Sequence, residues 1–292
     1  MITSSAIFAV QDAISRHLGE AVNIYMVLTI RFWFFALFVM ILAARSSGGF
    51  MSVARTQHPW AQLLRGLLLI TEIGLMIFAF VKLGLIETHA IFVCYPLLIT
   101  VLSGPILGEK VGWRRWLAVL VGFIGVLIIL NPTAGVFSAW ALVPFGGALT
   151  FALYSLATRY VSAKDSATTS FFWTGIIGAI VITPFAFSHW QNMAWGDWGL
   201  LGLLCITSVV SHGLLIRAYE VAEASAIQPF AYFQLPFVSI IGMLLFAEVL
   251  RINVVIGGAL VVAAGIFTLW RQRLRERQAL LAAAIQANQS RD

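Results

Sequence analysis

Charged side chains are scarce in this 292-residue sequence. Asp, Glu, Lys and Arg make up 10% of it, whereas an ordinary soluble domain carries about 25%. Hydrophobic residues make up 61%, and the mean hydropathy is +0.95. A water-soluble globular domain with this composition would expose far too much apolar surface, so we expect a membrane protein.

Catalytic motifs and cysteine frameworks are also missing. The sequence has no H-E-x-x-H zinc motif, nucleotide-binding P-loop or G-x-S-x-G elbow. Its two cysteines, Cys94 and Cys205, have no neighbouring partner, which argues against a disulfide framework or a zinc site. We therefore expect no enzyme activity, no metal and no cofactor. An intramembrane enzyme is kept only as a remote alternative.

The sequence does contain ten apolar stretches, each near the roughly 20 residues that a membrane-spanning helix needs. Their continuous runs of Leu, Ala, Gly and Phe are typical of helices and not of the short alternating strands of a membrane barrel. Hydropathy and helix breakers place the ten spans at about 2–16, 22–44, 60–83, 86–108, 113–130, 138–161, 167–187, 197–219, 224–247 and 253–270. The sequence thus predicts an all-α membrane protein with ten transmembrane helices.

Positive charge is distributed unevenly along the chain. If the N-terminus is cytoplasmic, most of the 18 Lys and Arg residues, including Arg65 and Arg159, fall on cytoplasmic connections and the C-terminal tail. This asymmetry sets the orientation of membrane proteins, and it predicts a bacterial-type inner membrane protein with both termini in the cytoplasm. The net charge of +6 is then a topological signal and an attraction to anionic lipids, so we expect no nucleic-acid partner.

The two halves of the sequence resemble each other at a shift of about 140 residues. Pro96 lies 13 residues before Glu109, and Pro236 lies 12 residues before Glu248; a Gly-punctuated span follows each glutamate. The predicted units are residues 1–132, residues 133–272 and a cytoplasmic tail at 273–292. Because each repeat would cross the membrane five times, an odd number, the second copy would be inverted. Inverted repeats around a central cavity are typical of secondary transporters.

Ten spans in two five-helix units, with a Pro and a closing Glu in the fourth and ninth spans, resemble the drug/metabolite transporter superfamily. Within it the sequence is similar to EamA-type exporters, and its aromatic content suggests the aromatic amino-acid exporter branch. The resemblance implies export of small metabolites, most of all amino acids including aromatic ones, by alternating access. A passive channel or facilitator for other solutes or drugs is the alternative. The oligomeric state stays open, with a monomer allowed.

Polar residues inside the spans are the first candidates for a substrate cavity, because an ionisable group in a membrane is costly unless it has a function or a partner. Glu72 lies mid-span in the third span, and Ser211 and His212 lie in the eighth. Each of these side chains either contacts a zwitterionic substrate or forms a structural hydrogen bond with a neighbouring helix. His89 lies near a predicted span boundary, where we expect it to be a solvated bystander.

Interior aromatic residues are the second group of candidates. A small-molecule site combines apolar walls with a few polar groups, and this description fits Tyr95, Tyr154, Trp173, Tyr232 and Gln234. These rings would suit the side chain of Phe, Tyr or Trp. The alternative is that they pack against lipid or neighbouring helices.

Further residues are candidates for hinges, gates or pairing. Proline removes a backbone donor, so Pro96 and Pro236 either bend their spans during transport or only shape the bundle. Glu109 and Glu248 stand at span ends, where a carboxylate caps the following helix or takes part in gating. Among the polar residues of the first two spans, Gln11, Asp12 and Arg31, we expect Asp12 to pair with Arg31 or Arg16.

Overall fold

The computed structural model describes residues 2–46, 48–108, 113–130, 139–221 and 232–289, and within these ranges every regular element is a helix. The first half comprises α1 (Ile2–Ala21), α2 (Ile24–Ala44), α3 (Gly49–Ala54), α4 (Pro59–Leu83), α5 (Leu85–Phe92), α6 (Tyr95–Leu107) and α7 (Trp113–Leu130). The second half comprises the short 3-10 turn η2 (Ala139–Ala141), then α8 (Leu142–Val161), α9 (Ala167–Ala186), α10 (Trp195–Val221), α12 (Gln234–Phe246) and α13 (Ile252–Gln289).

Five of the described helical segments are long and apolar enough to cross a membrane: Ile24–Ala44, Pro59–Leu83, Leu85–Leu107, Ala167–Ala186 and Trp195–Val221. Three shorter apolar stretches lie in α7, α12 and α13. The membrane character of the fold is therefore clear, whereas the number of ten crossings stays a prediction. The first helix is longer than expected, because α1 continues past residue 16 to Ala21.

The predicted fourth span is two helices in the structure. Helix α5 ends at Phe92 and α6 begins at Tyr95, so the break comes directly before Pro96, in the first turn of α6. Proline fits a first turn because the N–H that it lacks would have no helical partner there. Helix α12 likewise starts two residues before Pro236. The segment 224–231 of the predicted ninth span lies outside the described residues, as does Glu109.

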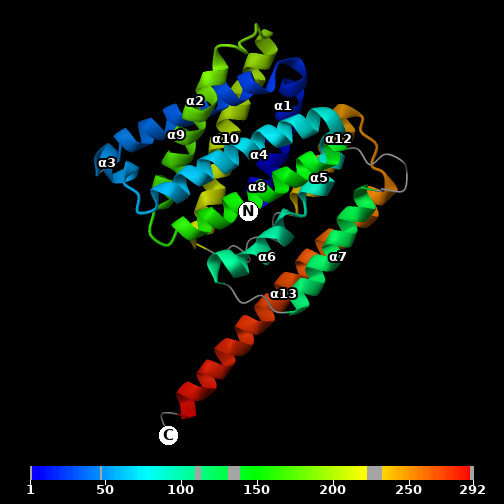
Figure 1. Ribbon diagram of the computed structural model, residues 1–292. Coiled ribbons are helices and arrows are strands. Elements are labelled where there is room, and N and C mark those ends of the chain that lie inside the picture. Colours follow the sequence, from blue (N-terminus) through cyan, green and yellow to red (C-terminus); the bar gives the residue numbers. More distant parts are fainter. Residues whose placement is uncertain (1, 47, 109–112, 131–138, 222–231, 290–292) are drawn as a thin grey trace.

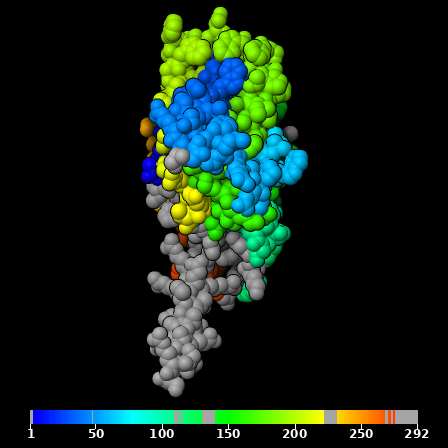
Figure 2. Space-filling view, turned by 90° about the vertical axis from the view of Figure 1, so that its left-hand side faces the viewer, coloured from blue at the N-terminus to red at the C-terminus, as the bar shows by residue number. Residues whose placement is uncertain are grey.

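Helix contacts recur in exchanged pairs, as a two-fold repeat requires. Helix α4 packs on α8, and its counterpart α10 packs on α1; α6 packs on α8, and α12 packs on α1. The pairs α2 with α9 and α7 with α13 join equivalent helices of the two halves. The halves are therefore interlaced, and segments of both lie against each other on the face shown in Figure 2.

Helices α7 and α13 run side by side and extend away from the other helices (Figure 1). Gly125 and Gly257 meet where they cross, and a Cβ atom on Gly125 would lie 2.7 Å from the carbonyl oxygen of Gly257. Small residues at such a crossing let two membrane helices approach closely. Helix α13 then continues without a break to Gln289, so the described part of the predicted tail is a helical extension.

A buried polar cluster ties the beginning of α4 to α8 and α9. Arg65, expected among the cytoplasmic surface cations, is instead fully buried. Its Nε donates to Thr158 Oγ1 at 2.9 Å, its Nη1 donates to Gln62 Oε1, and its guanidinium lies 5.2 Å from the ring centre of Tyr154. Neutral oxygens and an aromatic face therefore replace part of the water that this charge would otherwise bind. Its Nη2 has no hydrogen-bond partner among the described residues.

Asp165, in the loop between α8 and α9, extends the same cluster. It accepts hydrogen bonds from the backbone N–H of Gln57 at 2.9 Å, from Gln62 Nε2 at 2.9 Å and from the Thr56 hydroxyl. Burial acts to raise the pKa of Asp165, but these hydrogen bonds to the charged form outweigh it and lower the pKa below its usual value. The carboxylate thus fixes the entrance of α4 against the second half.

Candidate functional site

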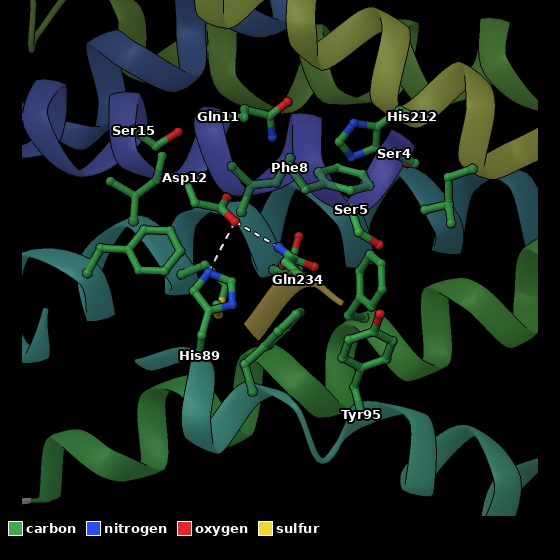
Figure 3. Close-up of a pocket in the computed structure, with 18 of the residues that line it drawn as sticks. Ser4, Ser5, Phe8, Gln11, Asp12, Ser15, His89, Tyr95, His212 and Gln234 are labelled. Atoms are coloured by element: carbon green, nitrogen blue, oxygen red, sulfur yellow. Dashed lines mark hydrogen bonds and ion pairs between the residues drawn. The ribbon is translucent and has the colours of Figure 1, made fainter. Parts of the chain in front are cut away.

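A pocket lies among helices of both halves, and one face of α1 forms its longest wall (Figure 3). Residues of α1 that recur every three to four positions share this face: Ser4, Ser5, Phe8, Gln11, Asp12 and Ser15. The remaining walls are built from single residues or short rows on seven other helices: Arg31, Glu72, Ile73, Met76, Ile77, Phe80, His89, Phe92, Tyr95, Phe151, His212, Leu215 and Gln234. The empty space between the lining atoms is about 610 Å³, including the part that is open to solvent.

Three aromatic rings form one apolar wall. The ring centre of Tyr95 lies 4.9 Å from that of Phe92 and 4.8 Å from that of Phe151, with an 84° angle to the Phe151 ring. The third pair, Phe92 and Phe151, is 5.6 Å apart. Such edge and tilted contacts are the favoured packing of aromatic rings. The break between α5 and α6 turns Tyr95 onto this wall, which explains how the chain uses the interruption before Pro96.

Asp12 joins three helices at the pocket surface. Its Oδ2 accepts a hydrogen bond from Gln234 Nε2 at 2.9 Å and lies 3.1 Å from His89 Nε2, as the dashed lines in Figure 3 show. The expected pairing of Asp12 with Arg31 or Arg16 is therefore wrong. His89 is also not a solvated bystander, because it is only 3% exposed and lines the pocket. Its Nε2 is close to Asp12 without the alignment of a hydrogen bond.

Charges of both signs line the pocket. Arg31 is 3% exposed, and its Nε donates to Ser208 Oγ at 2.6 Å, while its buried Nη2 has no hydrogen-bond partner among the described residues. Glu72 is 7% exposed and faces the same space. A buried guanidinium with an unused donor is unfavourable unless a ligand or water satisfies it. The pocket can therefore receive a hydrogen-bond acceptor at Arg31.

His212 and Ser211 take different roles although they are adjacent. His212 lines the pocket, and its Nδ1 lies 3.0 Å from the carbonyl oxygen of Ser208. Ser211 points to α1 instead, where its hydroxyl donates to Gln11 Oε1 at 3.2 Å and its carbonyl accepts from Ser4. Ser211 thus joins α10 to α1 behind the pocket wall.

The structure brings together four of the expected cavity residues and leaves four elsewhere. Glu72, Tyr95, His212 and Gln234 line the pocket, as do the three residues expected to pair with one another: Gln11, Asp12 and Arg31. The four that do not line it are Ser211, Tyr154, Trp173 and Tyr232.

Each of the three distant rings has another neighbour. Tyr154 lies next to Arg65 in the buried cluster at the beginning of α4. The indole of Trp173 donates to the carbonyl of Ala54 at 3.0 Å, which places it beside α3. Tyr232 is buried where a Cβ atom on Gly265 of α13 would meet it. Hydropathy cannot tell such rings from cavity residues, because all of them lie on apolar helices.

Glu248 closes the end of the bundle at which α4 finishes. It was expected either to cap the helix that follows it or to take part in gating. Its carboxylate accepts the backbone N–H groups of Leu85 and Ile86 at 2.7 and 2.8 Å, so the helix that it caps is α5. It also forms an ion pair with Arg16 of α1. The first N–H groups of a helix have no internal partner and favour an anion.

Two glycines make room for this carboxylate. Gly84 separates α4 from α5 with a φ of 84°, a conformation that suits glycine. A Cβ atom there would lie 2.6 Å from Glu248 Oε1, and a Cβ atom on Gly242 would lie 3.1 Å from Oε2. The chain therefore carries a fitted receptor for Glu248, one part of which, Gly84 and the start of α5, is far from it in sequence.

The chain was compared with known protein families. Residues 1–131 and 138–270 each match the EamA-like transporter family. The chain belongs to the EamA-like transporter family. This EamA-like protein is therefore a multi-pass membrane transporter of the drug/metabolite transporter superfamily and not an enzyme, and the two matches coincide with its two halves.

Relatives and a solved structure extend over nearly the whole EamA-like chain. A riboflavin transporter of Vibrio cholerae is 31% identical over 286 residues, which cover 95% of this chain and 94% of the relative. An S-adenosylmethionine uptake transporter of Rickettsia prowazekii is 24% identical and covers 94% and 90%. A protein of known crystal structure superposes with a TM-score of 0.63 at 21% identity, covering 94% of this chain and 97% of that chain, which shows the shared fold.

Proposed function

We propose that this protein is a secondary carrier for a small metabolite that has a planar aromatic ring and several hydrogen-bonding groups, with riboflavin as the first candidate. The observation that carries the proposal is the aromatic wall of Tyr95, Phe92 and Phe151 in the same pocket as polar side chains. The 31% identity to a riboflavin transporter supports the choice of ligand.

The two kinds of wall suit the two parts of such a molecule. A fused ring system stacks favourably on aromatic side chains, and the ring edge and a hydroxylated chain need donors and acceptors. Gln11, Asp12 and Gln234 supply these from one side, and Arg31 supplies a free donor from another. A ligand that leaves any of these buried groups without a partner would bind more weakly.

An aromatic amino acid is the second candidate, and the paired charges favour it. Glu72 matches an ammonium group and Arg31 matches a carboxylate, while the aromatic wall would hold the side chain. For this candidate the proposed direction of transport is export. The two candidates differ in charge, because riboflavin is neutral at physiological pH whereas an amino acid is a zwitterion.

Alternating access is the proposed mechanism for either ligand. We infer that residues 1–132 and 133–272 are inverted repeats that exchange conformations around the pocket. Glu248 contacts Arg16 and the start of α5 about one helical turn beyond Asp12. We infer that this contact closes one end of the pocket. The break before Pro96 and the start of α12 just before Pro236 supply the bending points in the proposed exchange.

Counterflow in proteoliposomes tests the proposal. Vesicles loaded with unlabelled riboflavin, phenylalanine, tryptophan or S-adenosylmethionine are diluted into traces of each labelled compound. We expect labelled riboflavin to accumulate transiently in riboflavin-loaded vesicles, and the Tyr95→Ala variant to raise the half-saturating concentration by about tenfold because ring stacking is lost. Accumulation only with amino acids would favour the second candidate. Flux without saturation or counterflow would indicate a channel and refute the carrier. Vesicles sorted by orientation give the direction.

A further inference from the structure

Two polar contacts connect the same three helices, α1, α5 and α12. The end tie consists of Arg16, Glu248 and the backbone N–H groups of Leu85 and Ile86. The pocket tie consists of Asp12, His89 and Gln234. In each tie, α1, α5 and α12 all contribute, either from within the helix or from the residue directly after its last turn. The three helices are therefore joined to one another at two places.

The spacing of the two ties makes them mechanically adjacent. Asp12 precedes Arg16 by four residues on α1, and Leu85 precedes His89 by four on α5. Four residues are close to one helical turn, about 5.4 Å along the axis, so on both helices the ties lie one above the other on the same face. A shift of α1 against α5 that opens one tie must therefore strain the other.

Helix α12 is held at both of its ends. Gln234 is its first residue, and Glu248 follows its last turn. Ala247 has a φ of 51°, and the N–H of Glu248 bonds back to the carbonyl of Gly242 at 3.1 Å. A non-glycine residue in this left-handed conformation is strained, and it persists where its surroundings require it. Here the turn directs the Glu248 side chain back toward α5.

The pocket tie is accessible to a ligand, whereas its histidine is held firmly. Asp12 has a side-chain exposure of 14% and lines the pocket. The ring of His89 stacks on Phe80 with 5.2 Å between ring centres and meets Phe92 edge-on at 5.8 Å. A molecule in the pocket can therefore compete for the carboxylate of Asp12, while His89 moves only with α5.

We propose that the pocket tie supports the end tie, so that a hydrogen bond made to Asp12 from inside the pocket loosens the closure formed by Arg16 and Glu248. His89 is the positioning residue of this latch, since it relays the state of Asp12 to the N-terminus of α5. The proposal rests on the proposed function for the identity of the ligand, but the coupling between the two ties does not depend on it.

Amide hydrogen exchange at Leu85 and Ile86 reports directly on the end tie. These are the first two N–H groups of α5, and in the described residues their partner is the carboxylate of Glu248. We would measure exchange over residues 84–92 with the full-length protein in lipid nanodiscs, first without any ligand. His89→Ala should accelerate exchange at both amides by about tenfold, the scale of one lost hydrogen bond to a charged group.

Two further variants separate the latch from general loosening. His89→Gln keeps a side-chain N–H near Asp12, and exchange should return to within about threefold of wild type. His212→Ala removes another buried histidine from the same pocket. Among the described residues its hydrogen bonds and ring contacts are with Ser208, Ser211, Phe8 and Phe35, which belong to neither tie, so exchange at Leu85 and Ile86 should stay unchanged. Unchanged exchange in His89→Ala, or equal acceleration in both alanine variants, would refute the proposal.

Riboflavin then tests the ligand step on the wild-type protein. Saturating riboflavin should accelerate exchange at Leu85 and Ile86 and should have no such effect in His89→Ala. If riboflavin gives counterflow but leaves these amides unchanged, the latch is refuted while the proposed function stands. If riboflavin gives no counterflow, its assignment as substrate fails, and the comparison without ligand still decides whether the ties are coupled.

Discussion

The two ends of α4 are fixed by polar clusters of opposite design. At its beginning, Arg65 is fully buried and its hydrogen bonds go to neutral oxygens of α4, α8 and α9. At its end, Glu248 and Arg16 form a charge pair whose side chains are 14% and 15% exposed. The first cluster cannot open without leaving a charge in an apolar interior, whereas the second can exchange its partners for water. The comparison indicates a permanent joint at one end and a separable closure at the other.

The largest expected effect tests the permanent joint. Arg65→Ala removes the hydrogen bonds that Gln62 Oε1 and Thr158 Oγ1 accept from the guanidinium and creates a cavity beside Tyr154. We therefore expect the free energy of unfolding to fall by about 3–5 kcal/mol. Unfolding by SDS in mixed micelles, followed by circular dichroism, measures this change. Arg65→Lys, which keeps the charge but loses the fork of donors, should lie between wild type and Arg65→Ala. A loss of less than 1 kcal/mol in the alanine variant would contradict a permanent joint.

A smaller effect is expected at the closure. Gly84→Ala forces an alanine into a φ of 84° and brings its Cβ against Glu248, which should reduce the free energy of unfolding by about 1–3 kcal/mol. The same SDS titration measures it. Gly202→Ala is a matched control, because a Cβ there meets no atom within 4 Å in a helix. Equal effects of the two variants would show that the receptor for Glu248 is not specific.

Acid should weaken the permanent joint through Asp165. Because its pKa is lower in the folded protein than in the unfolded chain, Asp165 contributes stability at pH values above its unfolded pKa of about 3.9. That contribution is lost as the pH falls through the folded pKa. The melting temperature of wild type should therefore exceed that of Asp165→Asn at pH 7, and the difference should shrink on titration toward pH 3. A difference that is constant over this range would argue against the hydrogen-bonded carboxylate.

The smallest effect is expected at an exposed ion pair near the closure. Arg251 Nη1 lies 2.8 Å from Glu87 Oε1, with side-chain exposures of 67% and 34%. Exposed pairs contribute about 0–1 kcal/mol, so Arg251→Gln should change the free energy of unfolding by less than about 0.5 kcal/mol. A larger loss would show that the Arg251–Glu87 pair, at the start of α13, also belongs to the closure.

Prediction from the sequence succeeded where hydropathy decides the outcome. Apolar composition and breaker residues predicted the helical membrane fold and most helix positions, because a bilayer admits few alternatives. The family was predicted from the resemblance of the two five-span units, with their Pro and closing Glu, to known transporters. Prediction failed for polar side chains near span boundaries, which can lie either in solvent or in the protein interior. Arg65 and His89 both lie near predicted span boundaries, and hydropathy there favours solvent, yet both are buried.

The same reasoning explains the mixed outcome for the candidate site. Glu72 and His212 were predicted to face the cavity because a membrane penalises unpaired polar groups, and both line the pocket. Trp173 and Tyr154 satisfied the same aromatic criterion, but the rotation of α9 and α8 directs them to Ala54 and Arg65. The rule that singled out Glu72, an ionisable group within a span, could also have found His89, which lies within the predicted span 86–108 but close to its start.

By itself, the sequence determined that the chain folds in a bilayer as helices and that its halves are related, since composition and spacing are properties of the chain. Only the tertiary structure decided which polar groups meet. Glu248 caps α5 and Asp12 joins His89 to Gln234, pairings between residues far apart in sequence. Such partners are chosen by helix rotation and tilt, and these follow from the packing of the whole bundle.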